Sequence, residues 1–235
     1  MENVSFLQKG KGKDLVLLHG YLSSKEAFAA QVAYFSRFYR VTAFDFLGMG
    51  GSAELPSPYS VEDYAEWTEE MLAAMGVHAP CVIAHSFGCR VLVKMASRAK
   101  FHFSKLVLTG PAGVVMNRGL RYKIRVRTYR FFRRFAPSFA ERRFGSAEYR
   151  SLSPIMRESY KKIVNEDLRA DAARVENSVL IVQGERDFVT PMREADAYRS
   201  VMKNARLTTI DGGHFAFAEN PVAFNILVEE FLQDD

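Results

Sequence analysis

Four short motifs in this sequence carry the residue types that an acyl-transfer site needs. They are "HGYLSS" from His19, "HSFG" from His85, "GERD" ending at Asp187 and "GGH" ending at His214. A serine hydroxyl is a weak nucleophile until a base takes its proton, and a neutral histidine is that base when a carboxylate holds its tautomer. Ser86, His214 and Asp187 supply these groups, so we expect nucleophilic attack by a serine.

The turn around Ser86 suits a nucleophile raised above a sheet, because an apolar strand-like run precedes it and a helical pattern follows at once. A sharp strand-to-helix turn crowds the neighbours of the serine, and Ala84 and Gly88 are the small residues expected there. The helix beyond the serine directs its positive end at the site, so the Phe87 N–H can meet a developing oxyanion. The Tyr21 N–H, after "HG", is the expected second donor.

Other residues compete for these roles. A serine after an apolar run is more often a helix cap than a nucleophile, and only the joint pattern favours the nucleophile. Glu185 and Asp211 are rivals for the acid, but the loop directly after a strand favours Asp187. The remaining histidines are expected to be structural or solvated. They are His19, bracing its loop, His85, pointing away from the nucleophile, and His78 and His102, in connections.

The elements that must position these residues alternate along the chain. Short apolar runs alternate with longer amphipathic ones, which predicts βαβ units around a mostly parallel sheet with helices on both faces. Ligands gather at the carboxyl ends of such strands, so the four motifs should meet. The expected strands are residues 4–7, 15–18, 41–44, 81–84, 106–108, 179–182 and 207–210.

Helices are expected between these strands. They are residues 25–35, 61–75, 87–99, 191–202 and 221–233. Several have recognisable start signals. These are capping-box spacings at Ser23 with Glu26 and at Ser60 with Asp63, and prolines suited to a first helical turn at positions 191 and 221.

The alternation breaks once, between Val114 and Val175. We interpret this stretch as an insertion of several helices over the sheet edge. Apolar residues within 120–135 suit a helical stripe, although part of that run also alternates with the period of a strand. Tyr122, Tyr129 and Phe132 are candidate lining residues for a substrate pocket.

The inserted segment is also strongly basic. Residues 118–150 contain eleven Lys and Arg against two acidic residues, a charge of +9, whereas the rest of the chain carries −4. A solvated arginine face of a helix explains this charge, because long Arg stems cover apolar surface while their charges stay in water. The alternative is recognition of an anionic substrate or an acidic acyl carrier; nucleic acid is less favoured.

Length and composition favour one α/β domain. The chain has 235 residues, 48% of them apolar, which is enough for one sizeable core. Cys81 and Cys89 lie in apolar context and indicate reduced core thiols, so a cytoplasmic protein is expected. No signal-peptide pattern or membrane-length apolar run is seen, so we expect no membrane span. The glycine-rich turn at 45–52 lacks the helix and lysine of a phosphate-binding loop.

Taken together, the motifs resemble those of the α/β-hydrolase superfamily. They are "HG" at His19, "DFLGMGGS" from Asp45, "AHSFG" from Ala84, "GERD" from Gly184 and "GGH" from Gly212. The order of serine, acid and histidine is that of the family. One departure is the alanine at position 84, where the usual nucleophile elbow has glycine, a substitution that the family accommodates.

The resemblance implies a particular architecture. We expect an α/β-hydrolase core at residues 1–113 and 176–235 and a helical cap, or lid, at residues 114–175. The cap would follow the sixth strand of the family pattern. Only one strand candidate precedes "LVLLHG", so the usual eight-stranded sheet should be shortened to about seven strands.

The resemblance also implies a hydrolase without a metal or cofactor. We expect a carboxylesterase or thioesterase acting on a small or medium acyl substrate. Ser86 would attack, His214 would carry the proton, Asp187 would orient the histidine, and the N–H groups of Tyr21 and Phe87 would hold the oxyanion. Two alternatives stay open: a non-hydrolytic ligand or acyl-carrier binding protein, and a carbon–carbon bond hydrolase using the same triad. A dehalogenase is disfavoured, because it would need an aspartate at position 86.

Overall fold

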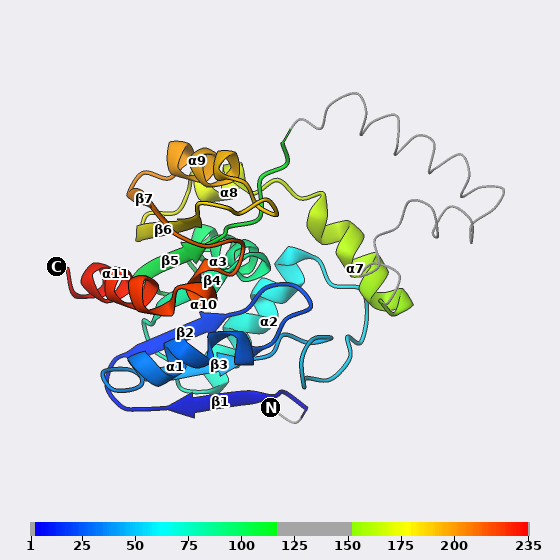
Figure 1. Ribbon diagram of the computed structural model, residues 1–235. Helices are drawn as coiled ribbons and strands as arrows, with labels where there is room; N and C mark the ends of the chain where they lie inside the picture. Colours follow the sequence, from blue (N-terminus) through cyan, green and yellow to red (C-terminus); the bar gives the residue numbers. More distant parts are fainter. Residues whose placement is uncertain (1–2, 117–151, 235) are drawn as a thin grey trace.

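A seven-stranded sheet forms the centre of the computed structural model, which describes residues 3–116 and 152–234 (Figure 1). The strand order is β1-β3-β2-β4-β5-β6-β7. β1 pairs antiparallel with β3, and every other neighbouring pair is parallel. The strands are β1 (Phe6–Lys9), β2 (Asp14–Leu18), β3 (Arg40–Phe44), β4 (Cys81–His85), β5 (Lys105–Thr109), β6 (Ser178–Gly184) and β7 (Ala205–Ile210). The predicted mostly parallel sheet of seven strands is confirmed, with β1 beginning two residues later than expected.

Helices cover both faces of this sheet (Figure 1). One layer contains α2 (Val61–Ala74), α3 (Phe87–Arg98), α8 (Arg169–Ala172) and α9 (Met192–Val201). The other contains the 3-10 helix η1 (Lys25–Phe28), α1 (Ala29–Phe35), α10 (Ala216–Glu219) and α11 (Pro221–Gln233). A further helix, α7 (Pro154–Val164), lies beside the loops that follow β2 and β3.

The two faces of the sheet have separate apolar cores, because successive side chains of a strand point to opposite faces. In β2, Val16 and Leu18 pack into the core under α2 and α3, whereas Leu15 and Leu17 pack into the core under α1 and α11. All four side chains are fully buried. Burial on both faces explains why the strands appear in the sequence as continuous apolar runs.

Three of the helix start signals can be compared directly with local structure. Ser60 caps α2: its hydroxyl accepts from the Asp63 N–H at 3.2 Å, and the Asp63 carboxylate accepts from the Ser60 N–H at 2.7 Å. Pro221 is the first residue of α11. Both predictions are confirmed. The helix α9 begins one residue later than predicted, at Met192, so Pro191 is its cap residue and does not belong to its first turn.

The capping box predicted at Ser23 and Glu26 is wrong. The helix there begins at Lys25, and the side chain of its cap residue, Ser24, makes no capping hydrogen bond. The Lys25 N–H donates instead to the Asp45 carboxylate at 2.6 Å. A contact with a residue distant in sequence has therefore replaced the local cap.

The insertion predicted at residues 114–175 is described only in part. α7 and α8 lie in its second half, whereas residues 117–151 are outside the described residues. The helix expected within 120–135, the arrangement of the basic residues and the three aromatic candidates, Tyr122, Tyr129 and Phe132, therefore stay predictions.

Both cysteines are free and buried, as expected from the sequence. Burial raises the pKa of Cys89, so its thiol stays protonated in the core beneath the site. Within residues 3–116 and 152–234, every helix is too short or too polar to cross a membrane.

Candidate active site

Ser86 occupies the turn between β4 and α3 in a strained backbone conformation. Its φ of 50° and ψ of −107° are seldom adopted by residues other than glycine. Its N–H donates to the Thr109 carbonyl at 3.1 Å, and its own carbonyl accepts from the Cys89 and Ala112 N–H groups. The Ser86 side chain makes no capping bond to α3. The helix-cap interpretation of this serine is therefore not supported.

Small residues allow the surrounding segments to approach this turn. A Cβ at Gly88 would overlap the Leu18 carbonyl oxygen, so α3 could not lie as close to the end of β2. A Cβ at Gly20 would lie 2.9 Å from His85 Nδ1 and 3.5 Å from the Ser86 Cβ. The loop after β2 therefore lies directly against the serine turn.

His214 and Asp187 form a hydrogen-bonded pair across the loops after β7 and β6. The distance from His214 Nδ1 to Asp187 Oδ2 is 2.8 Å. Asp187 Oδ1 accepts from the N–H groups of Val189 and Thr190, at 2.8 and 2.9 Å, and Oδ2 also accepts from the Thr190 hydroxyl at 2.8 Å. These four bonds hold the buried carboxylate in one orientation.

The environment of Asp187 keeps it ionised. Burial acts to raise the pKa of this carboxyl, but the hydrogen bonds from His214 and Thr190 outweigh that effect and lower the pKa to about 2. An ionised carboxylate only accepts hydrogen bonds, so the proton of neutral His214 is held at Nδ1. His214 Nε2 is then the basic nitrogen.

The rivals of these residues lie elsewhere. Asp211 is exposed and pairs with Arg186, and Glu185 is exposed at the end of β6. His78 and His102 are also exposed, as expected. Of the acids considered from the sequence, Asp187 is the one in contact with His214.

His19 is buried and braces the loop that contains Tyr21, as expected. Its Nδ1 donates to the Gly20 carbonyl at 2.7 Å, and its Nε2 accepts from the Phe46 N–H at 3.0 Å. Burial lowers the pKa of this imidazole, so both nitrogens stay committed to these neutral hydrogen bonds. His19 thus fixes the loop and has no free nitrogen for proton transfer.

Asp45 joins the same loop to the glycine-rich turn after β3. Its Oδ1 accepts from the Lys25 N–H, and its Oδ2 accepts from Lys25 Nζ at 3.1 Å and from the Gly51 N–H at 2.8 Å. The Asp45 side chain is fully buried. The sequence indicates a tight turn at this place but not its link to the loop after β2.

The two residues expected to supply the oxyanion hole are neighbours. The rings of Tyr21 and Phe87 pack edge to face with centroids 5.5 Å apart. Phe87 is the first residue of α3, where backbone N–H groups have no partner inside the helix. The Tyr21 hydroxyl donates to the Met156 carbonyl at 3.2 Å, so α7 is bonded to this loop.

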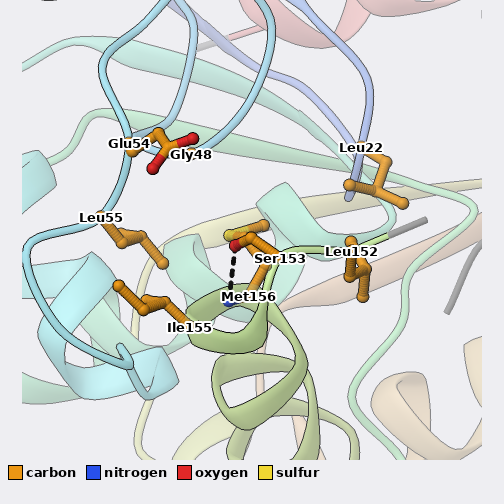
Figure 2. Close-up of a pocket in the computed structure, with 8 residues that line it drawn as sticks. All are labelled: Leu22, Gly48, Glu54, Leu55, Leu152, Ser153, Ile155 and Met156. Carbon is orange, nitrogen blue, oxygen red and sulfur yellow. Dashed lines mark hydrogen bonds between the residues drawn. The ribbon is translucent and has the colours of Figure 1, made fainter. Parts of the chain in front are cut away.

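A pocket of about 290 Å³ lies next to this loop (Figure 2). The Ser153 hydroxyl accepts from the Met156 N–H at 3.3 Å, so the start of α7 forms one wall. Five of the eight lining residues have apolar side chains, and the Glu54 carboxylate and the Ser153 hydroxyl make the rest of the lining polar. The lining residues are Leu22, Gly48, Glu54, Leu55, Leu152, Ser153, Ile155 and Met156.

Two residues beside the His–Asp pair were missed by the sequence analysis. Thr190 binds Asp187, and its hydroxyl also lies 3.2 Å from His214 Nδ1. A Cβ at Gly110 would lie 3.2 Å from both Asp187 Oδ2 and His214 Nδ1, and Gly110 has a φ of 51°. The available signals were a threonine three residues after the acid and a glycine directly after a strand.

The arrangement combines a strained serine, a histidine with its tautomer held by a carboxylate, and helix-end amides. The serine turn and the histidine loop are in contact, because His85 Nε2 lies 2.9 Å from the His214 carbonyl oxygen. Such a set of groups is suited to acyl transfer. Within residues 3–116 and 152–234, no three His, Cys, Asp or Glu side chains are grouped to hold a metal ion.

Comparison with known proteins shows a family for this chain and a similar fold in solved structures. Residues 15–225 match the family model described as the alpha/beta hydrolase family. The chain is 25% identical to pyrrolizixenacetamide deacetylase of Xenorhabdus hominickii over 97% of this chain and 94% of that protein. It is 31% identical to (E)-2-((N-methylformamido)methylene)succinate hydrolase of Acinetobacter baylyi over 83 residues, which are 35% of this chain and 32% of that protein. An esterase structure from Exiguobacterium antarcticum superposes with a TM-score of 0.80 and 20% identity, covering 98% of this chain and 96% of that one.

Proposed function

The chain belongs to the alpha/beta hydrolase family, and from this premise we propose that it is a serine hydrolase cleaving a small or medium acyl ester or thioester. One observation carries the proposal. His214 Nδ1 lies 2.8 Å from the buried Asp187 carboxylate, and the His214 loop contacts the strained turn of Ser86. The proposed catalytic residues are therefore Ser86, His214 and Asp187.

Acylation begins with the Ser86 hydroxyl. Its oxygen attacks the carbonyl carbon of the substrate, and its proton passes to His214 Nε2, since the Nδ1 proton is engaged by Asp187. The imidazolium that forms is stabilised by the ionised Asp187 carboxylate. A carboxyl with a pKa of about 2 stays ionised at neutral pH and is suited to this role.

The negative charge that develops on the substrate oxygen needs hydrogen-bond donors. The Phe87 N–H begins α3 and lies at the positive end of the helix dipole. The Tyr21 N–H belongs to the loop braced by His19 and Asp45. Two amides fixed before the reaction stabilise the oxyanion without rearrangement, and loss of one such donor typically costs about 100- to 1,000-fold in rate.

The leaving group then departs with a proton. Protonated His214 donates its Nε2 proton to the alkoxide or thiolate as the carbon–oxygen or carbon–sulfur bond breaks, which leaves the acyl group on Ser86. Water attacks the acyl-enzyme and gives its proton to His214 Nε2. The carboxylic acid is released when that proton returns to the Ser86 oxygen.

Substrate size is proposed to depend on the pocket beside Tyr21 and on a helical cap at residues 114–175. The pocket volume of about 290 Å³ and the apolar side chains among its lining residues support a small or medium acyl group. The basic segment at 118–150 supports a further proposal, that the substrate or its carrier is anionic.

Amide deacylation is a second candidate reaction. The match with pyrrolizixenacetamide deacetylase extends over nearly the whole length of both chains, and this observation favours an amide among the possible substrates. The same catalytic groups would serve, with His214 protonating the leaving amine. Carbon–carbon bond hydrolysis and a binding role without turnover stay alternatives.

The test is hydrolysis of p-nitrophenyl esters of increasing acyl length by the wild type, by Ser86→Ala and by the control Ser200→Ala, an exposed serine on α9. A fluorophosphonate should add once to the wild type and to Ser200→Ala, but not to Ser86→Ala. Turnover that peaks at one acyl length and disappears only in Ser86→Ala supports the proposal. Equal rates in all three proteins, together with no labelling, would favour the binding role.

A further inference from the structure

His85 is a buried histidine that the proposed reaction does not use. It is the last residue of β4, directly before Ser86, and is 1% exposed. Its Nε2 lies 2.9 Å from the His214 carbonyl oxygen. A carbonyl oxygen only accepts hydrogen bonds, so the proton of neutral His85 is on Nε2. His85 Nδ1 has no hydrogen-bond partner within the described residues.

The His85 ring also packs against the loop that contains His214. Its centroid lies 4.7 Å from that of His214 and 4.8 Å from those of Phe215 and Phe217. His214 is therefore held at two places, with Asp187 binding its Nδ1 and His85 binding its backbone carbonyl and contacting its ring. The first contact sets the tautomer, and the second touches both the backbone and the ring of His214.

We propose that His85 is a positioning residue for His214: its Nε2–H holds the His214 backbone and keeps the His214 imidazole directed at Ser86. This inference rests on the proposed function, in which His214 is the base. It gives a role to the histidine of the "HSFG" motif, for which the sequence predicted only that it points away from the nucleophile.

The chemistry of the contact favours a histidine over other side chains. A phenylalanine or leucine would fill the space but would leave the partly buried His214 carbonyl without this donor, which costs stability and order. A lysine or arginine would donate, but its fixed charge would oppose the imidazolium that His214 becomes. Neutral histidine supplies a donor without a charge.

The surroundings keep His85 neutral. Burial is the largest effect, and together with the neighbouring charge of His214 it lowers the pKa of His85 to about 3. Asp187 acts in the opposite direction and His19 in the same direction, and neither reverses the effect of burial. The hydrogen bond to His214 is thus retained across the pH range in which a histidine base works.

His85 also connects the sites of three motifs. A Cβ at Gly20 would lie 2.9 Å from its Nδ1 and 3.2 Å from its Cε1, so the glycine of "HG" lies against one edge of the ring. The opposite nitrogen reaches the histidine of "GGH". The ring therefore stands between the oxyanion loop and the base, on the residue next to the nucleophile.

Two substitutions separate the hydrogen bond from the space that the ring fills. In His85→Gln the side-chain amide retains an N–H donor close to the position of Nε2. In His85→Met a side chain of similar length fills the site without a donor. Both variants keep the site neutral, so a difference between them reports the hydrogen bond alone.

We expect His85→Met to lower kcat about 10- to 100-fold with KM unchanged, the size of loss produced by a catalytic group displaced by about 1 Å. His85→Gln should recover most of that loss. The rates are measured with the best p-nitrophenyl ester, and the rate of fluorophosphonate labelling of Ser86 is measured alongside. Equal losses in the two variants, or no loss in His85→Met, would overturn the assignment.

An NMR titration of the imidazole nitrogens tests the inference without turnover. In the wild type, His85 should stay an Nε2–H tautomer between about pH 5 and pH 9. In His85→Met the His214 signals should shift or broaden, and in His85→Gln they should return towards the wild type. A His85 that titrates in this range, or His214 signals identical in all three proteins, rejects the positioning role. Absence of ester turnover with the expected NMR result would count against the proposed function and not against this contact.

Discussion

The Thr190 hydroxyl donates to Asp187 Oδ2 at 2.8 Å, and the same oxygen accepts from His214 Nδ1 at 2.8 Å. Thr190 therefore shares the carboxylate oxygen that orients the proposed base. We predict that Thr190→Val destabilises the fold by about 1 kcal/mol, the usual net value of one buried hydrogen bond. It should also lower kcat, because Asp187 loses one of the four hydrogen bonds that hold its orientation.

Thr190→Ser is the matched control, since it keeps the hydroxyl and removes one methyl group. Urea denaturation gives the free energy of unfolding, and ester hydrolysis gives kcat. If Val and Ser at this position lower kcat equally, the hydroxyl does not support Asp187.

The low pKa of Asp187 predicts how stability depends on pH. Hydrogen bonds outweigh burial and lower this pKa from 3.8 to about 2, so the ionised form stabilises the fold above about pH 4. That contribution is lost as the pH falls from about 4 towards 2. Asp187→Asn has no carboxylate to protonate, so its unfolding free energy should change less over this interval. Thermal melts of both proteins at steps between these pH values measure the difference, and parallel curves would contradict the prediction.

Replacement of Asp45 should strongly destabilise the fold. Its fully buried carboxylate binds Lys25 and the glycine-rich turn, so Asp45→Asn leaves a partly buried ammonium without its buried anionic partner. Breaking a buried ion pair costs about 3 to 5 kcal/mol. Glu26→Gln is the control, because Glu26 pairs with the same Lys25 from an exposed position, where an ion pair contributes about 0 to 1 kcal/mol. Urea denaturation of both variants should separate these values; similar losses would mean that burial of Asp45 is not the cause.

The strained backbone of Ser86 should lower the stability of the fold, although the proposed reaction requires a serine there. Its φ of 50° is unfavourable for serine and easy for glycine. Ser86→Gly should therefore raise the free energy of unfolding by up to about 1 kcal/mol while abolishing hydrolysis. Ser86→Ala, which keeps a Cβ, should abolish hydrolysis without that gain. Thermal denaturation compares the two, and equal melting temperatures would argue against strain at the turn.

The sequence analysis succeeds where the deciding interactions are local or periodic. The apolar runs of β2 and β4 appear as strands because both of their faces are buried, and the Ser60 cap depends on a residue three positions away. It fails at Ser23 because the competing partner of the Lys25 N–H is Asp45, distant in sequence.

The same reasoning applies to the candidate site. The strand ends indicate which residues meet, so Ser86, Asp187 and His214 can be proposed from order alone. The supporting contacts are harder to predict. Thr190 lies three residues after the acid, but the position alone does not show that its hydroxyl binds the Asp187 carboxylate. The bond of His85 depends on how the loop after β7 folds against the end of β4, which no local pattern indicates.

A comparison of Gly110 with Gly76 separates the cost of backbone strain from the effect of crowding at the site. Gly110 and Gly76 have similar φ values, 51° and 63°, so an alanine at either position incurs a similar backbone cost of about 1 kcal/mol. The space around them differs. A Cβ at Gly76 meets nothing within 4 Å, whereas one at Gly110 lies 3.2 Å from Asp187 Oδ2 and His214 Nδ1.

We therefore predict that Gly110→Ala and Gly76→Ala lower stability to a similar extent, but that only Gly110→Ala lowers kcat. The added methyl group at Gly110 pushes on both atoms of the hydrogen bond that orients the base, and a small displacement of a catalytic group can cost about 100-fold in rate. Urea denaturation and ester hydrolysis on the two variants give both quantities. An unchanged kcat in Gly110→Ala would mean that the His214–Asp187 pair can shift without lowering the rate. Close packing of the pair would then not be needed for the reaction.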